Sequence, residues 1–122
     1  YGHGCQTRSF CHVRDVVPAL VKLMNCKDAI GKVINIGSDE EISINHLAEK
    51  IKKFTGSSSQ IVHIPYEKAY MEGFEDLTRR IPDITLAKKL IDFRPNYGIN
   101  EILDSIIYGV TNGKNFGFEP LV

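Results

Sequence analysis

The clearest periodic pattern of apolar residues lies over residues 43–56 and predicts an amphipathic helix. Apolar side chains recur there at spacings of three and four, which places them on one face of a helix. They are Ile44, Leu47, Ala48, Ile51 and Phe54. Ser43 stands where an N-cap is expected, and Gly56 supplies a C-terminal stop. The local signals therefore agree on both ends of this helix.

Weaker patterns predict the remaining elements. Residues 16–25 form an apolar helical face preceded by Asp15, which we expect to act as its N-cap. Thr85 is placed to cap a short helix that ends at Ile91, and apolar residues over 99–110 predict the last helix. Short apolar runs at 33–36 and 61–64 predict strands, and residues 2–13 two short extended pieces around a turn.

This order of elements predicts the α/β class, with short strands and three to four helices. The two inner strands are near four residues each, a length typical of strands that complete a larger body. The chain begins Tyr-Gly-His-Gly, and we expect it to be a piece of a longer protein. Residues 66–80 show no period and are rich in Tyr, Phe, Glu and Arg, which indicates a functional loop.

Composition removes several classes of function. The chain has 122 residues, 43% of them apolar and 25% charged, which is typical of one globular domain. Fifteen basic residues balance fifteen acidic ones, so we expect no nucleic-acid binding by a basic surface. The apolar runs are too short to span a bilayer, so we expect no membrane association.

The three cysteines indicate reduced thiols in a cytoplasmic protein rather than a disulfide framework. A metal site built from His3, Cys5, Cys11 and His12 is the alternative interpretation. Its spacing matches no common zinc pattern, and alternation along a strand would separate Cys11 from His12. We therefore expect no metal.

The motifs of several enzyme classes are absent. Gly2-His3-Gly4 begins like a dinucleotide-binding fingerprint, but the third glycine and an immediately following helix are missing. There is no Walker A sequence, and none of the five tyrosines begins a Tyr-x-x-x-Lys motif. We therefore expect this chain alone to carry no catalytic residues, to bind no NAD and to be inactive.

Four polar residues are the candidates for binding. Arg8 predicts an anion clamp, because a guanidinium offers paired donors to phosphate oxygens; the alternative is a surface arginine. The adjacent Arg79 and Arg80 repel each other, and an anion bound between them and Arg8 would relieve this repulsion. The alternative is that the two arginines are a solvated charge pair. Asn35 lies within an apolar strand, where it either satisfies the backbone or contacts a ligand. Asp39, Glu40 and Glu41 indicate a solvated acidic turn.

Four segments carry a family resemblance. Residues 1–15 resemble the YGxGxQxRxFxYVxD segment of the extended short-chain dehydrogenase/reductase proteins that act on nucleotide sugars. Residues 33–44 resemble their NxG-x-x-x-E-x-S/T-I stretch, and residues 80–85 their R-x-PD-x-S/T block. Residues 91–95 are similar to their L-G-W/Y-x-P turn. The segments lie in the family's order and cover nearly the whole chain.

The resemblance implies an NAD-dependent epimerase, dehydratase or decarboxylase, of the UDP-glucuronate decarboxylase kind. In that family an N-terminal Rossmann lobe holds NAD, which takes up and returns a hydride, and the parent enzyme is typically a homodimer. Residues 1–122 would be the C-terminal lobe that binds the nucleotide sugar, and the Rossmann lobe would be absent from this chain.

The resemblance also implies roles for the four candidates. Arg8 would contact the diphosphate, Asn35 the nucleoside, and Arg80, together with Arg79, the phosphate and ribose. His12 stands where the family usually has Tyr, and Asp92 where it usually has Gly. Asp is costlier than Gly at positive φ, so Asp92 affects the geometry of its turn.

Two functions from different classes follow. The leading one is binding of the nucleotide diphosphate of a sugar substrate, as part of such an enzyme. The alternative is a stand-alone interaction or scaffold module that keeps the fold without the ligand. The sequence does not choose the sugar or the reaction.

Overall fold

The structure is a computed structural model, and it describes residues 1–69, 71 and 76–112. Its elements follow one another in the order in which they are named here. They are β1 (Thr7–Arg8), α1 (Val13–Met24), the 3-10 turn η1 (Lys27–Ala29), β2 (Ile42–Ser43), α2 (Ile44–Phe54), α3 (Tyr66–Ala69), β3 (Arg79–Arg80), α4 (Thr85–Ile91) and α5 (Ile99–Thr111). Helices and a small sheet together confirm the α/β class. The described residues hold five α-helices, one more than expected, because α3 is a single turn of four residues.

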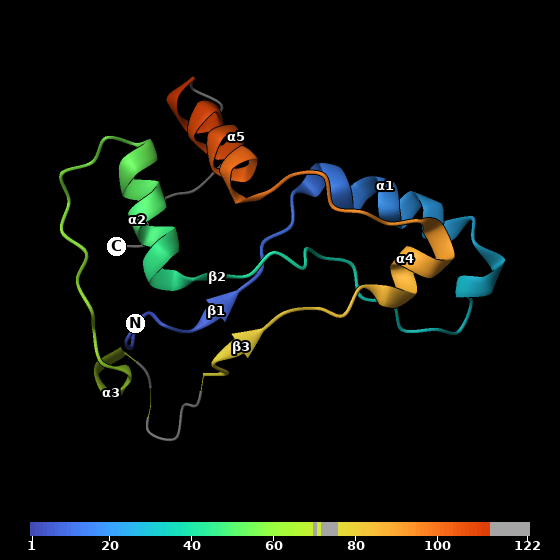
Figure 1. Ribbon diagram of the computed structural model, residues 1–122, viewed down its shortest axis with the longest axis horizontal. Helices are drawn as coiled ribbons and strands as arrows, with labels where there is room; N and C mark the ends of the chain where they lie inside the picture. Colours follow the sequence, from blue (N-terminus) through green and yellow to red (C-terminus); the bar gives the residue numbers. More distant parts are fainter. Residues whose placement is uncertain (70, 72–75, 113–122) are drawn as a thin grey trace.

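A small mixed sheet lies at the centre of the molecule, with helices toward both ends (Figure 1). Its strand order is β2-β1-β3, so β1 is the middle strand. β1 is antiparallel to β2 and parallel to β3, with Thr7 opposite Arg79 and Arg8 opposite Arg80. This register brings together two segments that are more than seventy residues apart in the sequence.

Two apolar clusters hold the helices in place. One lies where α1 and α4 pack together, and the other where α2 and α5 pack together (Figure 1). The buried members of the first are Ala19, Ile84, Ala87 and Phe93. Those of the second are Ile42, Ile99 and Leu103, with Leu47 and Phe54 packed against them. Because Ile42 belongs to β2, the second cluster also fixes the sheet against α2 and α5.

The caps predicted for α2 are confirmed. The Ser43 hydroxyl accepts a hydrogen bond from the His46 backbone nitrogen at 3.2 Å. At the other end, Gly56 has a φ of 63° and its nitrogen donates to the Lys53 carbonyl. A glycine adopts this left-handed conformation at little cost, so it ends the helix where the sequence places the stop.

The strands predicted at 33–36 and 61–64 are wrong. Neither segment pairs with another strand within the described residues, and Val33 and Val62 are 92% and 71% exposed. Of the extended pieces expected over residues 2–13, only Thr7–Arg8 joins the sheet. A strand exists through lateral backbone bonds to a partner, and an apolar run does not specify that partner.

The prediction that Asp15 caps α1 is also wrong. The helix begins at Val13, three residues before its expected start, and the Nδ1 atom of His12 accepts the hydrogen bond from the Arg14 nitrogen at 3.0 Å. The His12 ring also stacks at a tilt on Tyr97, with the centroids 4.7 Å apart. Asp15 instead lies in the first helical turn, where it is buried and accepts hydrogen bonds from the segment before α5.

The short helix α4 ends as its sequence suggests. Thr85 is its first residue rather than its cap, because the Asp83 carboxylate accepts the hydrogen bond from the Thr85 nitrogen at 2.9 Å. Asp92 follows the helix with a φ of 48° and a ψ of 46°. It is the only non-glycine residue with a positive φ among those that the structure describes. A position that favours glycine is therefore occupied by aspartate.

Candidate functional site

The parallel pairing of β1 and β3 places two arginines side by side. Arg8 and Arg80 are register partners, and both guanidinium groups point toward the Asp76 carboxylate. The Nη2 atom of Arg8 lies 2.5 Å from Asp76 Oδ1, and the Nη2 atom of Arg80 lies 3.8 Å from the same oxygen. Two cations that share one anion form a site that selects negative charge.

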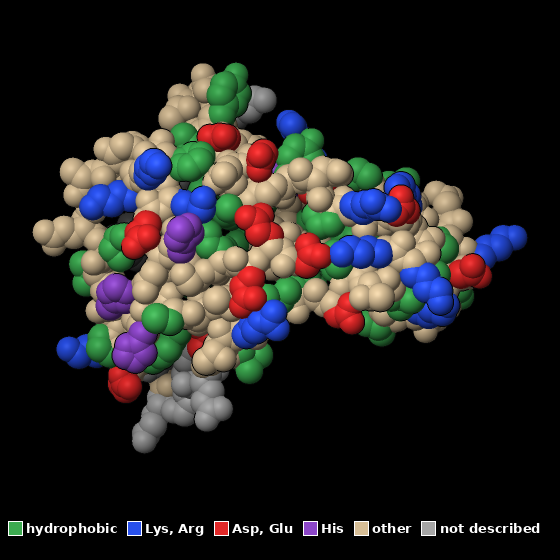
Figure 2. All heavy atoms as spheres, in the orientation of Figure 1, with side chains coloured by type: hydrophobic (Ala, Val, Ile, Leu, Met, Phe, Trp, Pro, Cys, Tyr) green, Lys and Arg blue, Asp and Glu red, His purple; other side chains and the backbone are tan. Residues whose placement is uncertain are grey.

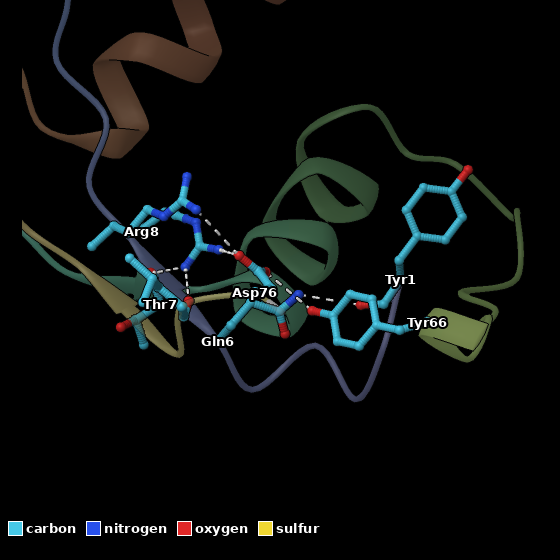
Figure 3. A network of polar contacts seen from close by, with 8 residues as sticks. Tyr1, Gln6, Thr7, Arg8, Tyr66 and Asp76 are labelled. Atoms are coloured by element: carbon cyan, nitrogen blue, oxygen red, sulfur yellow. Dashed lines mark hydrogen bonds and ion pairs between the residues drawn. The ribbon is translucent and has the colours of Figure 1, made fainter. Parts of the chain in front are cut away.

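Arg8 is held by the backbone as well as by the carboxylate. Its Nη1 atom donates to the Thr7 carbonyl at 2.7 Å (Figure 3). The same atom donates to the Leu77 carbonyl at 2.9 Å. The side chain is 19% exposed, against 57% for Arg80. The guanidinium of Arg8 is therefore fixed in direction, while most of Arg80 lies in solvent.

Asp76 is a site residue that the sequence interpretation missed. Its Oδ2 atom accepts a hydrogen bond from the Tyr66 hydroxyl at 3.1 Å, so each carboxylate oxygen has a partner (Figure 3). The Tyr66 ring lies against Gly2, where a Cβ atom would overlap it. The acidic and aromatic content of residues 66–80 indicated function there, but without periodicity it could not single out Asp76.

Arg79 faces the other way. Side chains of successive strand residues alternate between the two faces of a sheet, so Arg79 and Arg80 separate. Arg79 donates to the Glu41 carboxylate through Nε and Nη2 at 3.2–3.3 Å, and Thr7 donates to the same carboxylate at 2.5 Å. These hydrogen bonds from Arg79 and Thr7 lower the pKa of Glu41. The repulsion expected between the two arginines is thus relieved by two separate carboxylates.

Asn35 lies on the segment between η1 and β2 and is exposed. Its Nδ2 atom donates to the Asp83 carbonyl at 3.2 Å, three residues beyond Arg80. Among the described residues, no hydrogen bond or ion pair joins its side chain to Arg8, Arg79 or Arg80. The structure therefore brings Arg8 and Arg80 together, and places Arg79 and Asn35 apart from that pair.

The acidic turn over residues 39–41 is exposed to solvent, as the sequence predicted, and its carboxylates also bond to other parts of the chain. Asp39 pairs with Lys88 at 2.9 Å, and this hydrogen bond lowers the pKa of Asp39. The Glu40 carboxylate accepts from the Ile99 backbone nitrogen at 3.1 Å, at the start of α5. Each carboxylate of the turn thus fastens a different element, which sequence spacing alone could not show.

Within the described ranges, no group of three or more His, Cys, Asp or Glu residues is placed to hold a metal ion. Cationic and anionic side chains are interspersed on the face of the molecule shown in Figure 2. None of the helices in the described part of the chain is long and apolar enough to span a bilayer.

Comparison with known protein families gives a match over most of the chain. The sequence model of the GDP-mannose 4,6-dehydratase family matches residues 1–106. A UDP-N-acetyl-alpha-D-glucosaminuronate decarboxylase from Bacillus cytotoxicus is 48% identical over 79% of this chain and 30% of its own length. UDP-glucuronic acid decarboxylase 1 from Danio rerio is 39% identical over 88% of this chain and 24% of its own length. The chain thus spans less than a third of these relatives.

Solved structures show the same fold. UDP-glucose 4-epimerase from Thermotoga maritima, solved with UDP-glucose, has a TM-score of 0.80 at 26% identity, over 94% of this chain and 35% of its own. UDP-glucuronic acid 4-epimerase from Bacillus cereus, in complex with UDP-glucuronic acid and NAD, has a TM-score of 0.78 at 25% identity. That match covers 92% of this chain and 34% of the epimerase.

Proposed function

The chain belongs to the GDP-mannose 4,6-dehydratase family of NAD-dependent nucleotide-sugar epimerases and dehydratases, and we propose that it binds the diphosphate of a nucleotide sugar through Arg8 and Arg80. The observation that carries the proposal is the convergence of these two guanidinium groups on one anion. A diphosphate offers several charged oxygens to such a pair, and guanidinium groups match their geometry. Both epimerase structures described above were solved with UDP-sugars, which supports a ligand of this class.

Asn35 and Arg79 are the further contacts in this proposal. Asn35 uses its amide nitrogen toward Asp83, and the amide oxygen of this exposed side chain is the group proposed for the nucleoside. The Arg79 side chain is 68% exposed and would have to exchange Glu41 for the ligand. Its contribution is therefore expected to be smaller than that of Arg8 or Arg80.

The whole protein is proposed to be a two-lobe enzyme. The matched part of this chain corresponds to 34–35% of the two epimerase structures, one of which was solved with NAD. We assign the chain to the C-terminal substrate-binding lobe and NAD to an N-terminal Rossmann lobe. NAD would supply transient oxidation of the sugar, while this chain would position the nucleotide sugar and provide the charges that bind its diphosphate. We expect the whole protein to be a homodimer.

The glycines at the start of the chain do not form a turn that fits NAD. Gly2 and Gly4 have φ values of 66° and 69°, but the space beside each is taken by another side chain. A Cβ atom would overlap the Tyr66 ring at Gly2 and the Asn45 amide at Gly4. In a dinucleotide-binding turn, glycines instead allow the pyrophosphate to approach the backbone. These glycines therefore serve packing within the chain.

The outer face of α1 is the proposed contact with the Rossmann lobe. Apolar side chains that are half or more exposed lie along it, namely Val13, Val17, Leu20, Val21 and Met24. An apolar hollow of about 820 Å³ continues from the end of α1 past Cys26 to Ile30 and Ile34. Val33 beside it is 92% exposed on an extended segment. A contiguous apolar surface of this kind marks a contact with another protein surface.

Titration of the full-length protein with UDP tests the binding proposal. Arg80→Ala should weaken UDP binding, because a hydrogen bond to a charged group contributes about 1.5–3 kcal/mol, or roughly 10- to 150-fold. The exposure of Arg80 places the expected loss near the lower end, about tenfold. Arg80→Lys should recover part of it, since lysine keeps the charge but loses the planar fork.

Arg94→Ala is the matched control, because Arg94 is an exposed arginine paired with Asp92 outside the proposed site. Its UDP affinity and melting temperature should equal those of the wild type. Unchanged UDP affinity in Arg80→Ala would overturn the assigned role. A wild-type protein without affinity for UDP would favour the alternative of a scaffold module that keeps the fold.

A further inference from the structure

We propose that Asp76 is an internal competitor for the diphosphate, and that an incoming diphosphate must exchange with its carboxylate at Arg8 and Arg80. The inference rests on the proposed function of this site. It follows from the placement of Asp76 Oδ1 against the Nη2 atoms of both arginines. These donors are the ones that a phosphate oxygen would use. The affinity of the site then depends on how firmly the carboxylate is held.

Arg8 does not depend on Asp76 for its orientation. Both hydrogens of its Nη1 atom are directed to backbone carbonyls, those of Thr7 and Leu77. The side chain is largely buried, so the guanidinium plane stays fixed when the partner of Nη2 changes. A carboxylate whose task was to orient Arg8 would duplicate these two bonds. The geometry therefore favours competition over positioning.

The carboxylate is held from its other side by Tyr66. The Tyr66 hydroxyl donates to Oδ2 at 3.1 Å, and the tyrosine ring is itself packed against Gly2. Asp76 is 15% exposed, so solvent does little to replace these contacts when they break. Exchange with a diphosphate therefore has a cost. A ligand that engages both arginines offsets it better than a ligand that reaches only one.

Asp76→Asn in the full-length protein tests the inference, with UDP as the probe in calorimetry. Asparagine keeps the size and the acceptor for Tyr66 but removes the charge that holds the arginines. UDP and inorganic pyrophosphate should both bind about tenfold more tightly, the equivalent of one charge-assisted hydrogen bond. Asp39→Asn is the matched control, because this exposed carboxylate pairs with Lys88 outside the site, and its affinities should not change.

Tyr66→Phe is the second variant, in case Asp76→Asn does not fold. It keeps the ring that packs on Gly2 and removes the bond that holds Oδ2, so displacement becomes easier. UDP should bind about two- to threefold more tightly, since one neutral donor is lost. Tighter UDP binding in either folded variant supports competition.

Unchanged or weaker UDP binding in the folded variants would overturn the inference and make Asp76 a positioning residue. The Arg80→Ala result separates this failure from that of the proposed function. If Arg80→Ala still loses affinity, the diphosphate site stands without an internal competitor. If Arg80→Ala binds UDP like the wild type, the diphosphate site itself is wrong.

Discussion

The Asp15 carboxylate lies 3.2 Å from the backbone nitrogen of Tyr97, a residue 82 positions later in the chain. The same carboxylate accepts from the backbone and side-chain nitrogens of Asn96 at 3.2 and 3.3 Å. Asp15 is 5% exposed, so its side chain is buried, whereas Asn96 lies at the surface. The Asp15 carboxylate fastens the first turn of α1 to the segment that leads into α5.

Asp15→Ala should therefore destabilise the fold. Two backbone N–H groups lose their acceptor in a part-buried place, and an unsatisfied group that water does not reach costs about 1–3 kcal/mol. We expect the free energy of unfolding in urea to fall by about 2–4 kcal/mol. Asp28→Ala, at an exposed aspartate of η1, is the control and should change it by less than about 0.5 kcal/mol. If Asp15→Ala lowered the free energy of unfolding no more than Asp28→Ala does, water would have replaced the carboxylate.

Gly4→Ala and Gly31→Ala form a matched pair. Both glycines have positive φ, 69° and 73°, so alanine is strained at either position. A Cβ atom at Gly4 would overlap the Asn45 amide, whereas nothing lies within 4 Å of one at Gly31. Gly31→Ala should cost about 1–2 kcal/mol of unfolding free energy, and Gly4→Ala clearly more. Equal losses in urea unfolding would mean that Asn45 moves aside freely.

Asp92→Gly should stabilise the protein. Asp92 has a φ of 48° after α4, where glycine carries no steric penalty. We expect a gain of about 0.5–1 kcal/mol in unfolding free energy, reduced by the greater freedom of glycine in the unfolded chain. Arg94→Ala controls for the loss of the exposed pair with Asp92 and should be nearly neutral. A lower melting temperature for Asp92→Gly would contradict this account.

Glu41→Gln should change how stability depends on pH. Hydrogen bonds from Arg79 and Thr7 lower the pKa of Glu41 below its ordinary value of 4.5. The ionised group therefore adds stability above that value, and the contribution is lost as the pH falls through the lowered pKa. The wild type should melt higher than Glu41→Gln at neutral pH, and this difference should shrink as the pH falls below 4.5. A difference that stays constant with pH would assign the effect to packing.

The exposed face of α1 predicts self-association of the 122-residue chain by itself. Val17 and Val21 are 52% and 54% exposed on this face, and apolar surface of this extent drives association in water. Light scattering should show species larger than a monomer at high concentration. The double variant Val17→Glu/Val21→Glu should reduce them without unfolding the chain. A strictly monomeric wild-type chain would count against the face as a docking surface.

Local chemistry made much of the helical content predictable from the sequence. Ser43 and Gly56 were identified correctly because a cap is satisfied by atoms within a few residues. Asp92 was recognised as a departure from glycine, and its left-handed backbone explains why glycine is usual there. The spacing of residues 99–110 likewise predicted α5 to within a residue.

Contacts between distant segments were not predictable in this way. The strands expected at 33–36 and 61–64 would need partner strands, and an apolar run does not specify a partner. The strands that do pair, β1, β2 and β3, are two residues each. Asp15 was interpreted as a cap because its neighbours in sequence suggested it, yet its carboxylate is used by Asn96 and Tyr97.

The candidate site also has features that the sequence predicted and features that depend on contacts between distant segments. The sequence by itself determined which residues carry the charge, namely Arg8, Arg79 and Arg80, because side-chain chemistry needs no fold. Only the tertiary structure decided that Arg8 and Arg80 share Asp76 while Arg79 turns to Glu41. The physical reason is that the register between β1 and β3, and the alternation of side chains across a strand, become fixed only when segments more than seventy residues apart pair.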